Sequence, residues 1–298
     1  MKYTPKTLPE GINTSTEHPL REFALLTSGV IAAVLLLILV ASLLSDYLVR
    51  FIPVEMENRW LSAQASLQPG DETASPEQQA LESYLQSLIE QLGDDEHRNY
   101  TFTVRVIDEP TPNAFVVPGG HIFVTSGLLS MVTSENALAM VLGHEMAHQY
   151  HRDPIRSLGR GIVIVLALVA ISGADAGDLV QSFVADTANL GQLAYSREQE
   201  ADADETGVEL LMRHYGHAQG ASEFFRALDD SRSYDSHTPF FLRTHPGTED
   251  RIEFLRHYEM ERSGPLKPLP DFIGSYLAAK PVGAGEKCMD TLKASESC

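Results

Sequence analysis

Residues 23 to 45, FALLTSGVIAAVLLLILVASLLS, form a run without a charged side chain, bracketed by Glu22 and Asp46. As a helix this run would extend about 34 Å at 1.5 Å per residue, which is long enough to cross a bilayer. In hydrocarbon, backbone N–H and C=O groups have to be satisfied within the segment, so a single spanning segment must be helical. We therefore expect one transmembrane helix near the N-terminus, with the folded part of the chain after it.

The alternative to a retained anchor is a cleaved signal peptide, for which VAS at 40 to 42 would be a weak cleavage site. The apolar run is longer than a signal peptide normally has, which favours the anchor. Three basic residues precede the run within residues 1 to 22, and two follow soon after it. By the positive-inside rule, this bias predicts a cytoplasmic N-terminal segment and a main body on the other side of the membrane.

Composition divides the rest of the chain into three parts. Residues 46 to 74 are expected to be a connector, because QPGDETASPE is rich in Pro, Gly, Ser and acidic residues. Residues 75 to 262 carry the periodic segments and are expected to fold as one domain. Residues 263 to 298 are expected to be a Pro-containing tail. The tail holds Cys288 and Cys298, which are either two free thiols or a disulfide in an oxidising compartment.

The pattern from 75 to 262 predicts an α+β fold that is mainly helical with a small sheet. YTFTVRVID, at 100 to 108, alternates as a strand does, and NAFVVPGGHIFVTSG, at 113 to 127, predicts two short strands joined through Pro-Gly-Gly. Helices are predicted after the capping residues Ser75, Ser134 and Ser196, the second stopped by Pro154, and near 218 to 230 and 248 to 262.

A second uncharged run, GIVIVLALVAISGA, occupies residues 161 to 174. It is too short to span a bilayer comfortably. Two alternatives follow: it is a buried core helix, or it is an interfacial or re-entrant segment that also contacts the membrane.

The chain is strongly acidic, with 41 acidic against 22 basic residues and a formal net charge of −19. Such a surface repels the phosphate backbone, so we expect no nucleic-acid partner. No sequence feature indicates an oligomeric state.

The stretch VLGHEMAHQYHRDP supplies the first chemical signal. His144 and His148 lie four residues apart, so on a helix they share one face and can bind one Zn²⁺, while Glu145 can act on a metal-bound water. A catalytic zinc also needs a third protein ligand. Glu200 and Asp204, again four apart, suit a third ligand and a carboxylate that orients a ligand histidine. The alternative for this acidic stretch is a solvated helix start stabilised by the helix dipole.

Four segments, in this order, carry a resemblance to a known family: NAFVVPGGHIFVTSGLL, HEMAHQYHRD, SREQEADADETG and THPGTEDRI. Together they resemble the HtpX-like and CAAX-prenyl-protease family of gluzincin zinc metallopeptidases, over about residues 75 to 262. The resemblance implies a zincin-like metallopeptidase domain that binds one Zn²⁺ per chain and acts on polypeptides.

The resemblance also implies a role for individual residues. His144 and His148 match the helix ligands, and Glu200 matches the third ligand. Asp204 matches a supporting carboxylate bonded to His144, and Glu145 matches the general base.

Further residues match less central parts of the family motifs. His245 matches an active-site histidine and Arg251 its accompanying arginine. His245 either donates to the oxyanion, with Arg251 holding it or adding charge, or occupies the open zinc position at rest and has to move away. Asn113 and Ala114 match the start of an edge strand that binds extended peptide by main-chain pairing, the alternative being a strand capped by Asn. His151 is expected to be a helix-end residue rather than a ligand.

The function implied is a single-pass endopeptidase that hydrolyses misfolded or misassembled envelope proteins, placed in a bacterial inner membrane with its catalytic domain in the periplasm. A single membrane helix, instead of a multi-helix chamber, counts against prenylated substrates. The alternative is an assembly or chaperone-like factor on a peptidase fold, with the zinc site held shut by His245. A zinc hydrolase of non-peptide substrates is disfavoured by the edge-strand motif.

Overall fold

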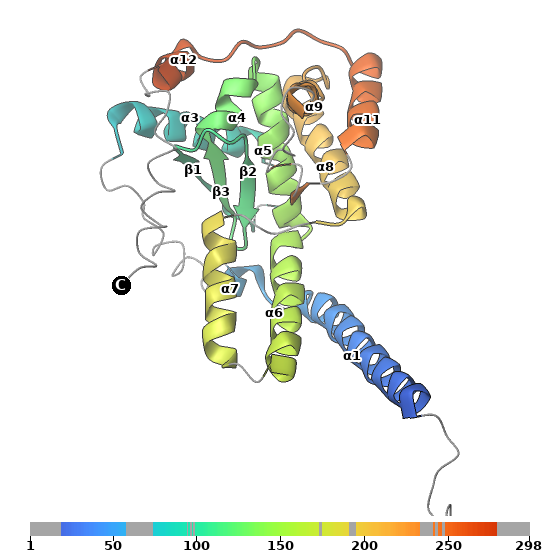
Figure 1. Cartoon of the computed structure of the whole chain (residues 1–298). Helices are drawn as coiled ribbons and strands as arrows, with labels where there is room; N and C mark the ends of the chain where they lie inside the picture. The colour runs from blue at the N-terminus through green and yellow to red at the C-terminus, as the bar shows by residue number, and fades with distance from the viewer. Residues whose placement is uncertain are drawn as a thin grey trace, which may run out of the picture.

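The computed structural model describes residues 19–57, 74–93, 95, 97, 99–172, 175–190, 195–232, 241, 244–245 and 248–278. Helix α1 spans Pro19–Val49 and contains the whole predicted transmembrane run. Among the described residues, this helix is long and apolar enough to cross a membrane. Its large apolar side chains are exposed, and it projects away from the rest of the fold (Figure 1). The two cysteines lie outside the described residues.

The sheet has three strands, β1 (Thr103–Ile107), β2 (Ala114–Val117) and β3 (His121–Thr125), in the order β1-β3-β2. β3 pairs with β1 in parallel and with β2 in antiparallel orientation. Gly119 and Gly120 make the turn between β2 and β3 with φ values of 95° and 80°, which side chains other than glycine rarely adopt. In the order β1-β3-β2, β2 lies at one edge of this sheet, as the family resemblance implied.

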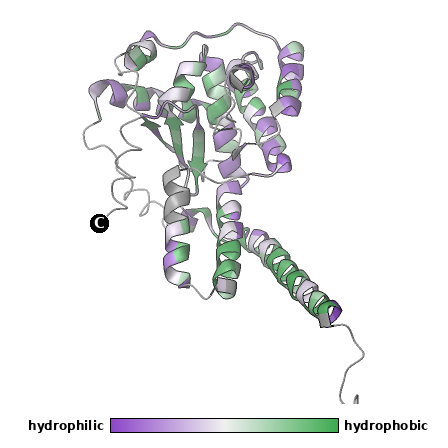
Figure 2. Ribbon diagram, viewed as in Figure 1, coloured by the Kyte–Doolittle hydropathy of each residue, from purple (hydrophilic) through white to green (hydrophobic). Residues whose placement is uncertain are grey.

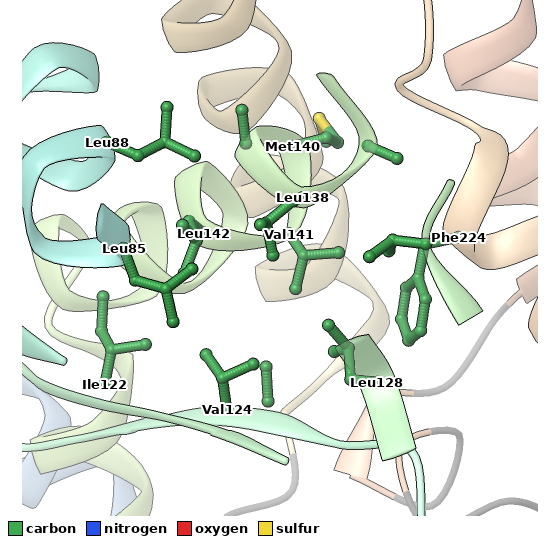
Figure 3. Close-up of a cluster of buried hydrophobic side chains, with 14 of the residues drawn as sticks. Leu85, Leu88, Ile122, Val124, Leu128, Leu138, Met140, Val141, Leu142 and Phe224 are labelled. Atoms are coloured by element: carbon green, nitrogen blue, oxygen red, sulfur yellow. The ribbon is translucent and has the colours of Figure 1, made fainter. Parts of the chain in front are cut away.

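Helices surround the sheet and supply most of the core. They are α3 (Pro76–Leu92), α4 (Ser126–Met131), α5 (Glu135–Tyr150), α6 (Asp153–Ser172), α7 (Ala176–Leu190), α8 (Arg197–Tyr215), α9 (Glu223–Arg232), α11 (Thr248–Glu261) and α12 (Asp271–Ala278). All residues of α5 are buried, because it packs against the sheet, α3 and α8. Figure 3 shows apolar side chains of α3, β3, α4, α5 and α9 meeting in this core.

Helix termini follow the predicted capping signals. Ser75 and Ser134 cap α3 and α5 by accepting a hydrogen bond from a backbone N–H of the first turn. Ser196 and Gln199 form a reciprocal capping box at the start of α8. Gly216, with φ 78°, ends α8 in the left-handed conformation. Local sequence thus fixes the beginning and the end of α8, one of the helices that build the site described below.

Two features after α5 differ from the sequence expectation. Pro154 lies in the first turn of a further helix, α6, as well as following the end of α5, and the two helices are separated by a break at Arg152, which has a φ of 60°. The run from 161 to 172 is not a buried core helix, since Ile164, Leu166 and Leu168 are between 46% and 58% exposed. Instead, α6 and α7 form a hairpin that extends beyond the sheet on the same side as α1 (Figure 1).

Residues 263 to 278, which composition assigned to a tail, contribute to the packing. Ile273 and Tyr276 of α12 are buried in the main core, where α12 contacts α3 and α4. The segment before α12 also lies against the start of α5, because the backbone N–H of Glu135 donates to the carbonyl of Lys267 over 2.8 Å.

A buried carboxylate joins several of these elements. The hydroxyls of Tyr84 and Tyr215 donate to Glu135 over 2.7 and 2.8 Å, and Lys267 Nζ lies 2.7 Å from the same carboxylate. Burial acts to raise the pKa of Glu135, but the hydrogen bonds from Lys267 and both tyrosines outweigh it and lower the pKa below its usual value. Glu135 thus links α3, α5, α8 and the segment before α12.

We expect Glu135→Gln to lower the free energy of unfolding by about 1–3 kcal/mol at pH 7, because three donors lose a charged acceptor at a buried position. Since the pKa of Glu135 is lower in the folded state than in the unfolded chain, its contribution is present above the unfolded pKa and is lost as the pH falls through the folded one. The difference in unfolding free energy between the wild type and Glu135→Gln should therefore become smaller as the pH is lowered. Chemical denaturation in detergent measures both effects. Glu253→Gln, at an exposed position of α11, is the matched control.

Candidate metal centre

Two closely packed helices bring the candidate ligands together. α5 carries His144 and His148, and α8 carries Glu200. The helices approach closely at Gly143 and Gly207: a Cβ added to Gly207 would lie 3.1 Å from the backbone nitrogen of His144. The absence of a side chain at these glycines lets α8 present its carboxylate to the histidines.

Four buried side chains converge at this position, those of His144, His148, Glu200 and His245, with one potential ligand atom of each within 4.8 Å of the others. The Nε2 atoms of His144 and His148 are 3.0 Å apart. The Glu200 carboxylate lies 3.5 Å from each of them. Three of the four are therefore the ligands predicted from the sequence, and the fourth is the predicted active-site histidine.

The outer nitrogen of each histidine on α5 faces a carboxylate. His144 Nδ1 lies 3.0 Å from Asp204, as predicted, and His148 Nδ1 lies 3.0 Å from Asp153. A carboxylate accepts the Nδ1 proton, which leaves the lone pair of Nε2 directed into the cluster. Two such lone pairs at 3.0 Å repel one another unless a proton or a metal cation lies between them. The donor set of two imidazoles and a carboxylate therefore fits a metal ion, and zinc prefers these ligands.

Arg251 holds the carboxylates of the site. Its Nε and Nη2 donate to the two oxygens of Asp204 over 2.6 and 2.8 Å, and its Nη1 lies 2.7 Å from Glu200. Burial acts to raise the pKa of both carboxyls, but the charge of Arg251, together with nearby histidines, lowers it below the usual range. Both groups are therefore ionised at neutral pH. Arg251 also approaches the imidazole of His144 and lies over the ring of Phe225, and no hydrogen bond joins it to His245 among the described residues.

Glu145 lies on the same helix between the two histidines, and both of its carboxylate oxygens are buried without a hydrogen-bond partner among the described residues. The nearest charged-group contact is His245 Nε2, at 3.7 Å. A buried carboxylate without donors is costly, and such groups are typical of functional sites. Its position beside the ligand cluster suits a base that acts on a metal-bound water.

His245 enters the cluster through its Nδ1 atom. This atom lies 3.0 Å from Glu200 and 3.4 Å from Nε2 of His144. The imidazole stacks on Phe241, with ring centroids 4.3 Å apart. His245 is thus oriented so that it can act as a fourth ligand.

Two residues that contact His148 were not predicted from the sequence. Asp153 is buried and accepts its Nδ1 proton across the break between α5 and α6. Tyr195 stacks on the His148 ring, with centroids 3.9 Å apart, and burial raises its pKa well above the usual value, so the phenol keeps its proton. The only sequence signal for Asp153 was an acidic residue next to Pro154, and the one for Tyr195 was its place before the cap of α8.

The remaining predicted residues lie outside the ligand cluster. Asn113 is buried just before β2, and its Oδ1 atom has no hydrogen-bond partner among the described residues. Ala114 begins β2, which packs against α5. His151 is the C-cap of α5 and contacts Thr206 over 3.2 Å, so it is a helix-end residue, as expected.

The sequence pattern of peptidase family M48 matches residues 75–259, which is more than half of the chain. The chain belongs to peptidase family M48. The narrower HtpX-like and CAAX-prenyl-protease grouping stays an expectation. Family membership, the helix-rich fold with a small sheet and the buried cluster agree on a zincin-type metallopeptidase domain.

Curated relatives are similar over the same region. Mitochondrial metalloendopeptidase OMA1 of Schizosaccharomyces pombe is 33% identical over 158 residues, covering 52% of this chain and 46% of the relative. A putative beta-barrel assembly-enhancing protease of Vibrio cholerae is 34% identical over 186 residues, which cover 59% of this chain and 38% of the relative. The beta-barrel assembly-enhancing protease of Escherichia coli is 28% identical over 173 residues, which cover 55% of this chain and 35% of the relative. The chain thus spans less than half the length of these relatives, whose names support a metallopeptidase.

Metal content tests the site directly. We expect wild-type protein to bind one Zn²⁺ per chain and Glu200→Gln to bind it at least about 100-fold more weakly, because the amide removes a charged ligand. Glu198→Gln changes the same side chain two residues away at an exposed position of α8 and should leave affinity unchanged. Chelator competition followed by metal analysis measures both. Equal zinc affinity in the two variants would contradict the ligand assignment.

Proposed function

We propose that the chain is a membrane-anchored, zinc-dependent endopeptidase that hydrolyses misfolded or misassembled envelope proteins. The observation that carries this proposal is the arrangement of α5, which presents two imidazoles to Glu200. Beside them lies the carboxylate of Glu145, which has no hydrogen-bond partner among the described residues. A binding protein would gain nothing from a buried, unpaired carboxylate at this place, because such a group is destabilising. Hydrolysis of a peptide bond needs such a base.

In the proposed mechanism, His144, His148 and Glu200 hold the ion. When bound, zinc lowers the pKa of a coordinated water and polarises the scissile carbonyl. Glu145 accepts the proton of the attacking water and passes it to the leaving amine. Asp204, held by Arg251, keeps His144 in the orientation that directs Nε2 to the metal.

His245 has one of two roles in this proposal. As a donor it would stabilise the oxyanion. As a fourth ligand it would close the site at rest and leave when substrate binds. The approach of Nδ1 to Glu200 and His144 supports the second role. It also supports the alternative function, an assembly or chaperone-like factor whose metal site His245 keeps shut.

Substrate would bind along β2. An edge strand offers backbone groups to an extended chain, so recognition would depend little on substrate sequence. This suits an enzyme that acts on unfolded segments of many proteins. Ala114 begins the strand, and Oδ1 of Asn113 just before it, which has no partner among the described residues, could accept a hydrogen bond from a substrate N–H.

The membrane part of the proposal rests on two surfaces. The exposed apolar side chains of α1 suit a lipid environment, and the similarity to bacterial beta-barrel assembly-enhancing proteases supports association with the envelope. We place α1 in the inner membrane with the catalytic domain in the periplasm, on the basis of the basic residues before the uncharged run. The distal half of α6 is also apolar and exposed (Figure 2). Since α6 extends on the same side as α1, we propose that residues 161 to 172 contact the membrane as well.

Proteolysis by the full chain in detergent or nanodiscs tests the function, with casein as an unfolded substrate. We expect Glu145→Gln to reduce cleavage by at least about 100-fold while zinc stays bound, because only the base is lost. Glu205→Gln, at an exposed position of α8, is the matched control and should cleave like wild type.

His245→Ala separates the two proposed functions. If His245 closes the site at rest, this variant should cleave faster than wild type, and adding Glu145→Gln should abolish the gain. If His245 is an oxyanion donor, His245→Ala should instead be slower. Zinc binding without cleavage in either protein would favour the assembly factor.

A further inference from the structure

We infer that Asp153 is a positioning residue for the metal ligand His148, and that Gln199 and Arg160 connect it to the end of the membrane helix α1. The inference rests on the proposed metal site. It gives a function to residues outside the ligand cluster. Through them, the affinity for the metal would depend on the contact between helix α1 and the peptidase domain.

Asp153 is suited to hold His148 in place. Its side chain is 1% exposed, and one oxygen lies 3.0 Å from Nδ1 of the imidazole. Asp153 is in the first turn of α6, where the helix dipole favours a negative charge. A carboxylate fixed in this way sets both the tautomer and the ring orientation of a ligand histidine.

Gln199 holds the other oxygen of Asp153. Its amide nitrogen donates to Asp153 Oδ1, while its amide oxygen accepts from the backbone N–H of Ser196 over 3.0 Å and from Arg160 over 3.2 Å. Reversing the amide would turn its oxygen toward a carboxylate and its nitrogen toward two donors, so only one orientation is favourable. Because Gln199 lies in the first turn of α8, which carries Glu200, the same side chain contacts both the start of α8 and the residue of α6 that holds His148.

Arg160 extends the connection to α1. Its Nη1 atom lies 3.1 Å from both oxygens of Asp46, the first charged residue after the uncharged run. α1 and α6 are close together here, because a Cβ added to Gly159 would lie 2.3 Å from Oγ of Ser45. A displacement of α1 against the domain would therefore break the ion pair and release Gln199 from one of its partners.

A second, independent set of bonds fixes the same point of the chain. Arg152 precedes Asp153, and its guanidinium donates to the carbonyls of Val49 and Ile52 and, over 2.8 Å, to the buried carboxylate of Glu57. Its φ of 60° is unfavourable for a residue with a side chain, and these bonds hold it there. The end of α1 is thus tied to Arg152, the residue directly before Asp153, which holds His148.

The test measures zinc affinity of the full chain in nanodiscs by chelator competition, together with the visible absorption spectrum of the Co²⁺-substituted protein. We expect Asp153→Asn to bind zinc about 10- to 100-fold more weakly and to show an altered Co²⁺ spectrum. Asp46→Asn, about one-third exposed and remote from the ligands, should weaken binding by about 2- to 10-fold. Asp178→Asn, exposed on α7, is the matched control and should bind like wild type.

The double variant separates the connection from an unspecific loss of stability. If Asp46 acts through Asp153, combining the two changes should weaken binding no further than Asp153→Asn alone. Additive effects, or an Asp46→Asn affinity equal to that of Asp178→Asn, would refute the connection to the anchor. Wild-type affinity and spectrum in Asp153→Asn would refute its positioning role even though Glu200→Gln loses metal. Absence of zinc binding by the wild type would instead overturn the proposed function, and this inference with it.

Discussion

The close packing of α5 against α8 is the contact on which the site depends. The two imidazoles come from one helix and the carboxylate from the other, so the ligand distances are set by the separation of the helix axes. Gly143 and Gly207 permit that separation, since a Cβ at Gly207 would already lie 3.1 Å from the backbone nitrogen of His144. A wider spacing would move Glu200 away from both Nε2 atoms and leave a buried carboxylate without its partners.

Charge balance explains why so many ionisable groups can be buried together. Each ligand histidine of α5 donates its outer proton to a carboxylate, Asp204 for His144 and Asp153 for His148. Arg251 offsets part of the remaining negative charge by contacting Asp204 and Glu200, and a divalent cation would offset more. Removing one of these partners would leave an uncompensated charge in the interior, which costs far more than the intact pair contributes.

Local sequence predicted the parts of this structure that depend on short-range spacing. The shared face of His144 and His148 follows from helical periodicity, and the capping residues set the helix starts. Asp153 could not be found in this way, because its contact with His148 crosses a helix break made by the positive φ of Arg152. The exposure of residues 161 to 172 could not be predicted either, because an uncharged run suits both a buried core helix and a helix that contacts lipid. Burial of α12 depends on contacts with α3, about 190 residues earlier in the chain.

The position of His245 implies a trade-off between holding the metal and admitting substrate. Its Nδ1 contacts Glu200 and approaches His144, so in this arrangement it can complete the ligand set. Its segment is held by main-chain bonds, from His245 to Phe241 and from Tyr195 to Thr244. Tyr195 also stacks on His148, so movement of His245 would loosen a ring that supports a ligand. Under the proposed closing role of His245, access for substrate and firm metal binding would be opposed at one residue, and the support of His148 by Asp153 would be most important once His245 had moved away.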